Sequence, residues 1–368
     1  MGYPGRPGCL DPSPIRERCP QIAPAIFRGL ACAGRLGFMA RLEVLRLAAA
    51  QDGLITRSQA LSAGMSIGAL RHAVRAGGSW QRVVPGVYAT FTGPLQDLHR
   101  LRTAELVVGA DGMITGSWAC RSWGLRYGPE PGEQVDVLLD RRRDRGRVGF
   151  IRVIRTSHLP EPRRCVDEAR FQELRRSGPP LELVFDGTVS SPGVVTLAPP
   201  ARAVVDTIVH ARQPWALRDA RALMCEVVQR RRSTVAELCA EVAAAPRRGG
   251  AVARRAIRDI AAGCRSAPEC ELRDLVLTSR LLPEPRWNRT LPGHRRIVPD
   301  ACWPEARLVV EVDSRSFHGF GDAPRRTEER RARYAMLGWR VLPVSPMRLR
   351  SEPQAVLREI EAAYLAGD

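Results

Sequence analysis

The sequence predicts a multi-domain chain of mixed α/β structure. Its 368 residues are enough for two or three domains at roughly 150 residues each. Hydrophobic residues make up 44% and charged residues 26%, the balance of an ordinary globular protein. Segments with apolar residues at helical spacing alternate with short segments of strand periodicity. Because the sequence has no run of about 18 uncharged apolar residues, we expect a cytoplasmic chain with no membrane partner.

The charge of the chain favours a polyanionic partner. All 57 basic residues are arginine, 39 residues are acidic, and the formal net charge is +18. This excess is typical of proteins that bind nucleic acid, and GC-rich coding, which replaces lysine by arginine, is the alternative explanation. A chain without lysine has no P-loop lysine, no Schiff-base lysine and no nucleotidyl-lysine. We therefore expect no nucleotide cofactor.

The ten cysteines show no pattern of a zinc site. They are scattered without a C-x-x-C pair, and no histidine lies at zinc-finger spacing. We interpret them as reduced, partly buried side chains of a cytoplasmic protein.

The first folded unit is expected at residues 39–92. Residues 1–38 are rich in Pro, Gly and Arg without apolar periodicity, which indicates a disordered tail or an upstream extension. Three short helices and a hairpin then follow, which is the order of a winged helix-turn-helix. The helices are predicted from Arg41 to Asp52-Gly53, over 57–63 after a Thr56 cap and over 67–75 after a Ser66 cap, and the hairpin over 80–90 turns at Pro85-Gly86.

The third predicted helix carries the candidate DNA contacts. In a winged helix-turn-helix this helix enters the major groove of double-stranded DNA. There Arg71, His72 and Arg75 would meet bases or phosphates, while Arg82 on the hairpin reaches the backbone. The alternatives are a solvated helix face and a winged helix used for protein contact.

Three stretches of this unit are distinctive, namely Gly53–Arg57, Ala63–Ser66 and Trp80–Tyr88. They resemble the N-terminal winged-helix domain of AbiEi-like antitoxins. Two later stretches, Gly116–Cys120 and Thr196–Asp206, resemble the segment that follows it in these proteins. Because such antitoxins are abortive-infection proteins that repress their own operon, the resemblance implies DNA binding and a cognate toxin or operon partner.

The sequence of residues 93–262 predicts a mixed α/β middle region and shows no group of residues typical of a catalytic site. An arginine run over 141–147 lies between two predicted strands, where it either follows a phosphate backbone or forms a solvated hairpin tip. The predicted elements are helices over 101–109, 114–123, 201–209 and 217–229 and strands over 134–139 and 149–155.

Residues 263–368 contain carboxylates in a pattern that suits a metal. Two strands are predicted over 297–303 and 307–313. Glu311 and Asp313 point to the same face of the second strand, about 7 Å apart. Two carboxylates at the end of a buried strand repel each other unless a cation or a strong donor lies between them. The spacing therefore predicts a divalent metal.

Further residues complete this candidate site. Asp300 from the neighbouring strand would give three carboxylates for Mg²⁺ (or Mn²⁺), which takes a few carboxylates, waters and substrate phosphates. His318 is placed to carry a proton or to bind the phosphate. Glu269 lies on an amphipathic helix over 268–276 that precedes the strands.

Together these residues form a pattern that extends over about one hundred residues. It comprises Glu269, Pro299-Asp300, Glu311-Val312-Asp313, His318, Arg330 and Gly338–Leu342. The pattern resembles the PD-(D/E)xK nuclease superfamily, in particular the branch similar to very-short-patch mismatch repair endonucleases. The resemblance implies a restriction-endonuclease-like domain with a mixed sheet flanked by helices, and Mg²⁺-dependent hydrolysis of DNA.

The resemblance also implies roles for single residues. Asp300 and Asp313 would hold the metal, Glu311 would hold it or orient the attacking water, His318 would shuttle a proton, and Glu269 would support them or add a ligand.

The chain departs from the superfamily pattern at three positions. Asp313 takes the place of the usual lysine, Ser314 stands where this branch generally has glycine, and Thr327 stands where an aspartate commonly precedes the arginine-bearing helix.

Two classes of function follow from the sequence. The first is a DNA-binding, metal-dependent endodeoxyribonuclease in phage defence or DNA repair. The alternative is a non-catalytic, antitoxin-like transcriptional repressor in which the nuclease fold is degenerate and its acids cap strands or bind arginines. A scaffold that binds RNA or protein is a third interpretation of the same charge.

Overall fold

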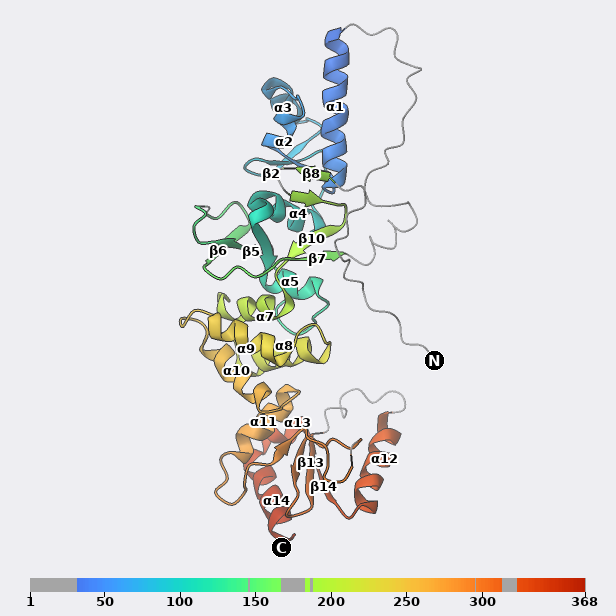
Figure 1. Ribbon diagram of the computed structural model, residues 1–368, viewed down its shortest axis with the longest axis vertical. Helices are drawn as coiled ribbons and strands as arrows, with labels where there is room; N and C mark the ends of the chain where they lie inside the picture. Colours follow the sequence, from blue (N-terminus) through green and yellow to red (C-terminus); the bar gives the residue numbers. More distant parts are fainter. Residues whose placement is uncertain are drawn as a thin grey trace.

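The computed structural model describes residues 32–144, 146–166, 183–185, 188–294, 296–312 and 323–367. It confirms a mixed α/β chain. Sheets of three, five, four and two strands combine parallel and antiparallel pairs with helices. Three segments follow one another along the long axis (Figure 1), and we call them the N-terminal (32–92), middle (93–262) and C-terminal (263–367) segments. No helix in the described residues is long and apolar enough to cross a membrane.

The N-terminal segment has the predicted sequence of helices followed by a hairpin. Thr56 caps the second helix by accepting a hydrogen bond from the Gln59 backbone, and Ser66 caps the third by accepting one from Ala69. The elements are α1 (Cys32–Ala50), β1 (Leu54–Thr56), α2 (Arg57–Ser62), α3 (Ile67–Ala73), β2 (Gln81–Val84) and β3 (Val87–Ala89), and the strands pair in the order β1-β3-β2.

Three features of this segment differ from the sequence prediction. Helix α1 begins at Cys32, inside the predicted tail, although Gly34 and Gly37 lower the helix propensity of its first turns and no apolar period marks them in the sequence. Helix α3 ends at Ala73 rather than at residue 75. Strand β1 was not predicted, since three residues are too short for a strand signal and its pairing partner lies more than thirty positions away. Residues 1–31 lie outside the described part of the chain.

The middle segment contains a five-stranded mixed sheet with the order β6-β5-β4-β10-β7. Its core extends from this sheet into a group of helices that includes α7 and α8. The elements are α4 (Asp97–Val108), η1 (Gly109–Asp111), β4 (Gly112–Thr115), α5 (Gly116–Ser122), β5 (Val135–Asp140), β6 (Ile151–Thr156), β7 (Arg163–Val166), β8 (Leu183–Phe185), β9 (Thr188–Ser190), β10 (Val194–Leu197), α7 (Pro200–Val209), α8 (Leu217–Gln229), α9 (Val235–Ala244) and α10 (Ala251–Ala261).

Two predictions for this segment were wrong in part. The predicted helix over 114–123 starts as strand β4, because residues 113 and 114 are buried between the neighbouring strands β5 and β10. Strands β5 and β6 pair in parallel, so the arginine run between them is a crossover connection and not a hairpin tip. Strands β7 to β10 and helices α9 and α10 were not predicted.

The C-terminal segment is a four-stranded mixed sheet with helices. Strands β11, β12 and β13 are antiparallel neighbours, and β14 lies parallel to β13. Helices α11 and α14 share a core with the inner strands, and α12 packs next to β14 (Figure 1). The elements are α11 (Ala267–Val276), β11 (Arg286–Trp287), β12 (Ala301–Trp303), β13 (Leu308–Val312), α12 (Ala323–Met336), β14 (Arg340–Val344), α13 (Pro346–Ser351) and α14 (Pro353–Leu365).

The buried hydrophobic side chains form one main cluster in each segment, and the hairpin belongs to two of them. Tyr88 packs in the N-terminal cluster, whereas Val84 and Val87 pack in the middle cluster. Gly149 of the middle segment permits this contact, since a Cβ there would come within 2.8 Å of the Val84 side chain. The hairpin therefore rests on the middle segment.

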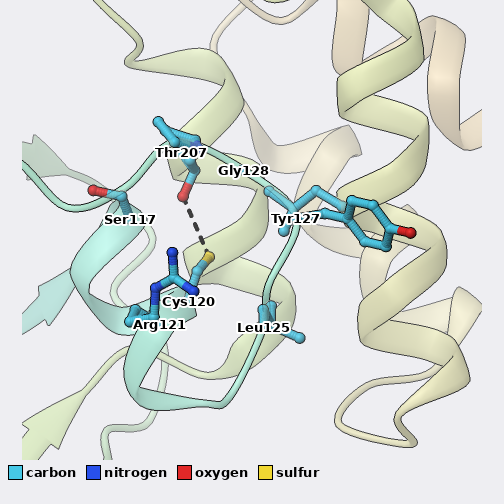
Figure 2. Close-up of a pocket in the computed structure, with 9 residues that line it drawn as sticks. Ser117, Cys120, Arg121, Leu125, Tyr127, Gly128 and Thr207 are labelled. Carbon is cyan, nitrogen blue, oxygen red and sulfur yellow. Dashed lines mark hydrogen bonds between the residues drawn. The ribbon is translucent and has the colours of Figure 1, made fainter.

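A small pocket opens between α5 and the loop after it (Figure 2). Within it the Cys120 thiol and the Thr207 hydroxyl lie 3.3 Å apart and share a hydrogen bond. Burial raises the pKa of Cys120 to about 12, so this thiol stays protonated. The enclosed space of about 10 Å³ holds roughly one water molecule. We therefore do not regard this pocket as a ligand site.

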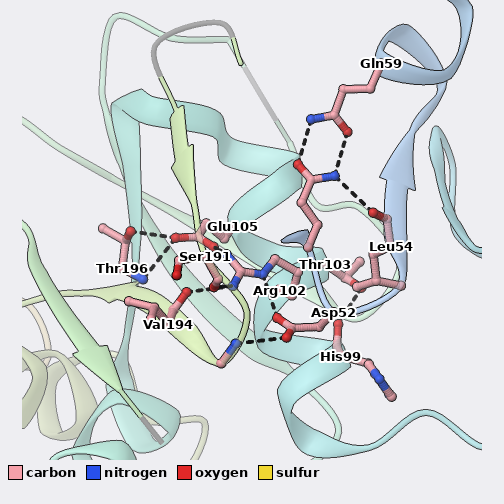
Figure 3. A network of polar contacts seen from close by, with 12 residues as sticks. Asp52, Leu54, Gln59, His99, Arg102, Thr103, Glu105, Ser191, Val194 and Thr196 are labelled. Atoms are coloured by element: carbon pink, nitrogen blue, oxygen red, sulfur yellow. Dashed lines mark hydrogen bonds and ion pairs between the residues drawn. The ribbon is translucent and has the colours of Figure 1, made fainter. Parts of the chain in front are cut away.

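A buried arginine joins the N-terminal and middle segments (Figure 3). The Arg102 side chain on α4 is 0% exposed and donates to Asp52 at 2.9 Å and to Glu105. It also donates to the backbone carbonyls of Ser191 at 2.6 Å and Val194 at 2.7 Å. Asp52 lies in the turn after α1, so one guanidinium connects this turn, α4 and the strand β10 region.

A second buried arginine joins the middle and C-terminal segments. Arg221 on α8 contacts Asp259 on α10 at 2.5 Å and Asp274 on α11 at 2.6 Å. Asp259 is fully buried and also accepts from Arg273 of α11 at 3.1 Å. Helix α11 is therefore held against α8 and α10 by paired charges.

We predict that Arg102→Ala destabilises the protein by about 3 to 5 kcal/mol, because it leaves Asp52 and Glu105 buried without their cation. Urea unfolding followed by circular dichroism measures the loss. The control is Arg121→Ala, whose partner Glu130 is exposed and whose removal should cost about 1 kcal/mol or less. Equal losses for the two variants would contradict a structural role for the buried network.

Candidate functional site

Strand pairing brings Asp300 and Glu311 together in the C-terminal segment. Residue 301 of β12 is the partner of residue 310 of β13, so continuing this antiparallel register places Asp300 opposite Glu311. The Asp300 carboxylate accepts a hydrogen bond from the backbone N–H of Val312 at 2.8 Å. Asp300 lies directly before β12, so the strand predicted over 297–303 begins only at Ala301, because Pro299 has no N–H for the ladder.

The Asp300 carboxyl has a strongly perturbed acidity. Burial raises its pKa to about 7, and the negative charges of Glu311 and Glu269 add to the shift. The Val312 N–H and the charge of Arg330 act in the opposite direction. At neutral pH this side chain is therefore close to the midpoint of its titration, as expected for a buried carboxyl with other carboxylates beside it.

Glu311 is held by two donors from helix α12. The Tyr334 hydroxyl donates to Glu311 Oε1 at 2.6 Å, and the Arg330 guanidinium lies 2.9 Å from the same oxygen. Burial raises the pKa of Glu311, while these two donors lower it. Arg330 also donates to the carbonyl of Val298 at 2.6 Å, which links α12 to the segment before Asp300.

Glu269 lies close enough to influence both carboxyls, but its own oxygens are already bonded. One oxygen accepts from the Ser266 hydroxyl at 2.8 Å. The other accepts from the backbone of Arg265 at 2.8 Å and from the Asn288 side chain at 2.6 Å. Glu269 therefore helps to cap α11 and adds negative charge to the site, which fits a supporting role better than that of a metal ligand.

The described residues give two carboxylates for a metal. Within them, no group of three or more His, Cys, Asp or Glu side chains is arranged to hold an ion. Asp313 and His318 lie outside the described part of the chain. One oxygen each of Asp300 and Glu311 accepts no hydrogen bond from the described residues. Mg²⁺ commonly binds one or two carboxylates with waters and phosphate oxygens, so this donor set fits it.

Two residues of this site were not predicted from the sequence. Tyr334 is completely buried and reaches Glu311 from α12. Asn288 bonds Glu269 through its side chain, and its backbone N–H donates to the Asp300 carbonyl at 3.0 Å. The only sequence signal for Tyr334 is its position four residues after Arg330, which places both on one helix face. Nothing in the local sequence indicates the role of Asn288.

The predicted DNA contacts lie on the surface of the N-terminal segment. Arg71 and His72 are exposed in the last turn of α3, Arg75 is exposed just beyond the helix, and Arg82 is exposed on β2. None of these four side chains has an ion pair among the described residues. Gly78 makes the tight turn after α3, because a Cβ there would come within 2.2 Å of the Ala73 carbonyl.

The arginine run after β5 is exposed in its described residues. Arg143 pairs with Asp111, and Asp144 lies 3.7 Å from Arg155 on β6. Part of its charge is therefore balanced locally. Arg141 and Arg142 are exposed and form no ion pair within the described residues.

We predict that Asp300→Asn stabilises the metal-free protein at pH 8 by an amount on the order of 2 kcal/mol, with little effect near pH 4. The folded pKa of about 7 lies above the ordinary value of 3.8. Below about pH 4, Asp300 is protonated in both the folded and the unfolded chain. As pH rises through 7, the unfolded chain ionises first and the buried carboxyl must then ionise at a cost, so the free energy of unfolding falls. Urea unfolding in EDTA at both pH values measures this, with the exposed Glu305→Gln as control. An equal effect at the two pH values would refute the shifted pKa.

Comparison with known proteins gives a partial match. No family model matches the chain. Two proteins of Mycobacterium tuberculosis, MT2308 from strain CDC 1551 / Oshkosh and Rv2248 from strain H37Rv, are each 30% identical to it over 175 residues. The match covers 46% of this chain and 63% of each relative, which is less than two thirds of their length. Both relatives are described as uncharacterized, so the chain is similar to proteins without an assigned activity.

Proposed function

We propose that this protein is a DNA-binding, metal-dependent endodeoxyribonuclease whose reaction centre lies around Asp300 and Glu311. The observation that carries the proposal is the pairing of these two carboxylates at adjacent strand ends, where burial and mutual repulsion raise the pKa of Asp300 to about 7. Carboxylates kept together at such a cost in free energy are typical of a site that binds a cation. The resemblance to very-short-patch-repair-like nucleases supports the same chemistry.

The N-terminal segment would supply the DNA binding. Its helices and hairpin have the order of a winged helix-turn-helix, and the exposed side chains of Arg71, His72 and Arg75 are available for contacts with DNA. Arg82 is available on the hairpin. Because Val84 and Val87 pack on the middle segment, only the exposed side of the hairpin would reach a duplex.

Each residue of the centre has a role in this proposal. Asp300 and Glu311 would hold Mg²⁺ or Mn²⁺, with Asp313 as a further ligand. The bound ion supplies an activated water near neutral pH and neutralises charge on the phosphate. Glu269 keeps the site negative, and Arg330 holds Glu311 in place. His318 would transfer a proton to or from the reacting oxygens.

A second function is favoured by a different observation. Both oxygens of Glu269 and one of Glu311 already accept hydrogen bonds from protein donors. Acids that are bonded in this way also occur in folds without catalytic activity. An antitoxin-like transcriptional repressor, in which this segment serves only for binding, is therefore the alternative, and a cognate toxin would then be its partner.

We predict Mg²⁺- or Mn²⁺-dependent cleavage of double-stranded DNA that falls at least about 100-fold in Asp300→Asn and Glu311→Gln. The physical reason is the loss of a negatively charged ligand without a change in side-chain size. Plasmid and labelled-duplex cleavage, with EDTA as the metal-free control, gives the rates, and gel-shift assays show whether binding is kept. The matched control is Glu305→Gln, an exposed carboxylate in the turn between β12 and β13, at the opposite end of these strands from Asp300 and Glu311.

DNA binding without cleavage under any divalent metal would refute the nuclease and favour the repressor. Binding that is lost together with cleavage in Asp300→Asn would instead indicate that this variant disturbs the fold.

We predict that the double variant Arg71→Ala/Arg75→Ala lowers DNA affinity by about 10-fold to 100-fold and makes the salt dependence shallower by up to about two counterions. The reason is the loss of two phosphate or base contacts. The control is Arg247→Ala/Arg248→Ala, which removes the same charge from an exposed loop of the middle segment. Fluorescence anisotropy over a range of salt concentrations measures both effects. An equal loss of DNA affinity in the two double variants would mean that the net positive charge of the chain attracts DNA without a specific binding surface on α3.

A further inference from the structure

We propose that Tyr334 is a positioning residue for the metal ligand Glu311, because its hydroxyl holds one carboxylate oxygen and thereby directs the other toward the ion. The proposal rests on the proposed function. It assigns a role to a side chain that is distant in sequence from the strand it serves.

The Tyr334 ring is buried. The residue is 0% exposed and packs with Leu291, Cys302 and Val309 in a cluster on one side of the sheet. A phenylalanine would fill this apolar space equally well. A buried phenol hydroxyl, in contrast, must find a hydrogen-bond partner or lose free energy. At Tyr334 the partner is Glu311 Oε1, at 2.6 Å.

Two donors from α12 meet at this one oxygen of Glu311. Tyr334 and Arg330 both bond Glu311 Oε1, and they lie four residues apart on the same face of α12. The Arg330 guanidinium lies 6.0 Å from the centre of the Tyr334 ring, so the two groups also contact each other. Two donors on Oε1 restrict the orientation of the carboxylate, and Oε2 accepts no hydrogen bond from the described residues.

The two donors differ in what they contribute. The Arg330 side chain is 44% exposed and carries a positive charge, so it competes electrostatically with a cation at Glu311. Tyr334 is buried and, because burial raises the pKa of its hydroxyl, neutral, so it orients the carboxylate without opposing the ion. Partners that orient a ligand in this way commonly change metal affinity by 10-fold to 100-fold when they are removed.

The test compares Mn²⁺ binding to the wild-type protein and to Tyr334→Phe by isothermal titration calorimetry and Mn²⁺ electron paramagnetic resonance, in the absence of DNA. We expect the dissociation constant to rise by about 10-fold while the metal-free melting temperature changes little. The matched control is Tyr88→Phe, which removes the hydroxyl of another buried tyrosine in the N-terminal segment and should leave Mn²⁺ binding unchanged.

The possible outcomes separate this inference from the proposed function. If the wild-type protein binds Mn²⁺ and Tyr334→Phe binds it equally well, the positioning role is refuted while the nuclease proposal stands. If the wild-type protein binds no Mn²⁺, both fail. Tyr334→Met, which keeps an apolar side chain, serves as the second variant in case Tyr334→Phe does not fold. If neither variant folds, the Tyr334 hydroxyl is needed for folding, and the positioning role is overturned.

Discussion

Buried guanidinium groups at the two junctions are the interaction on which the arrangement of this molecule depends. A chain without lysine must use arginine for every buried basic contact, and the five donors of a guanidinium suit that use. Arg102 bonds two carboxylates and two carbonyls, and Arg221 bonds two carboxylates. Each set of partners comes from elements that are distant in sequence, so each arginine fixes how two segments meet.

Helix α11 connects the second junction to the candidate site. Glu269 lies in its first turn and faces the site, while Asp274 lies near its end and pairs with Arg221. The same ten-residue helix therefore contacts the middle segment and contributes charge beside Asp300. Because a helix is stiff over this length, the position of Glu269 is coupled to the packing of α8 and α10. The arrangement of the candidate site therefore depends on both the middle and the C-terminal segments.

The candidate site itself reflects a balance between repulsion and hydrogen bonding. Glu311 and Glu269 lie close enough to Asp300 to raise its pKa, and each of the three carboxylates accepts at least one hydrogen bond from a protein donor. These bonds keep the acids in place, and Arg330 balances part of the charge of Glu311. A nuclease needs such charge for a cation, whereas a repressor has no evident use for it, and this difference is the physical reason to prefer the catalytic interpretation.

The sequence by itself determined those features that local chemistry controls. Thr56 and Ser66 cap helices where their spacing predicts, Pro85-Gly86 makes the predicted turn, and the apolar run before Glu311 is a buried strand. The proximity of Asp300 and Glu311 was also expected from the predicted strands, and the strand register confirms it. A functional role for Glu269, Asp300 and Glu311 stays a prediction. The roles proposed for Asp313 and His318 remain predictions.

Only the tertiary structure decided what depends on distant pairing. Strand β4 replaced a predicted helix, β5 and β6 paired in parallel, and Tyr334 and Asn288 joined the site from elements that carry no such signal. The buried networks of Arg102 and Arg221 were equally invisible, since an arginine that meets its partners across 50 or 38 positions looks like any other arginine in the sequence. The physical reason is that hydrogen bonds and ion pairs of this kind are formed by packing, which the local order of residues does not encode.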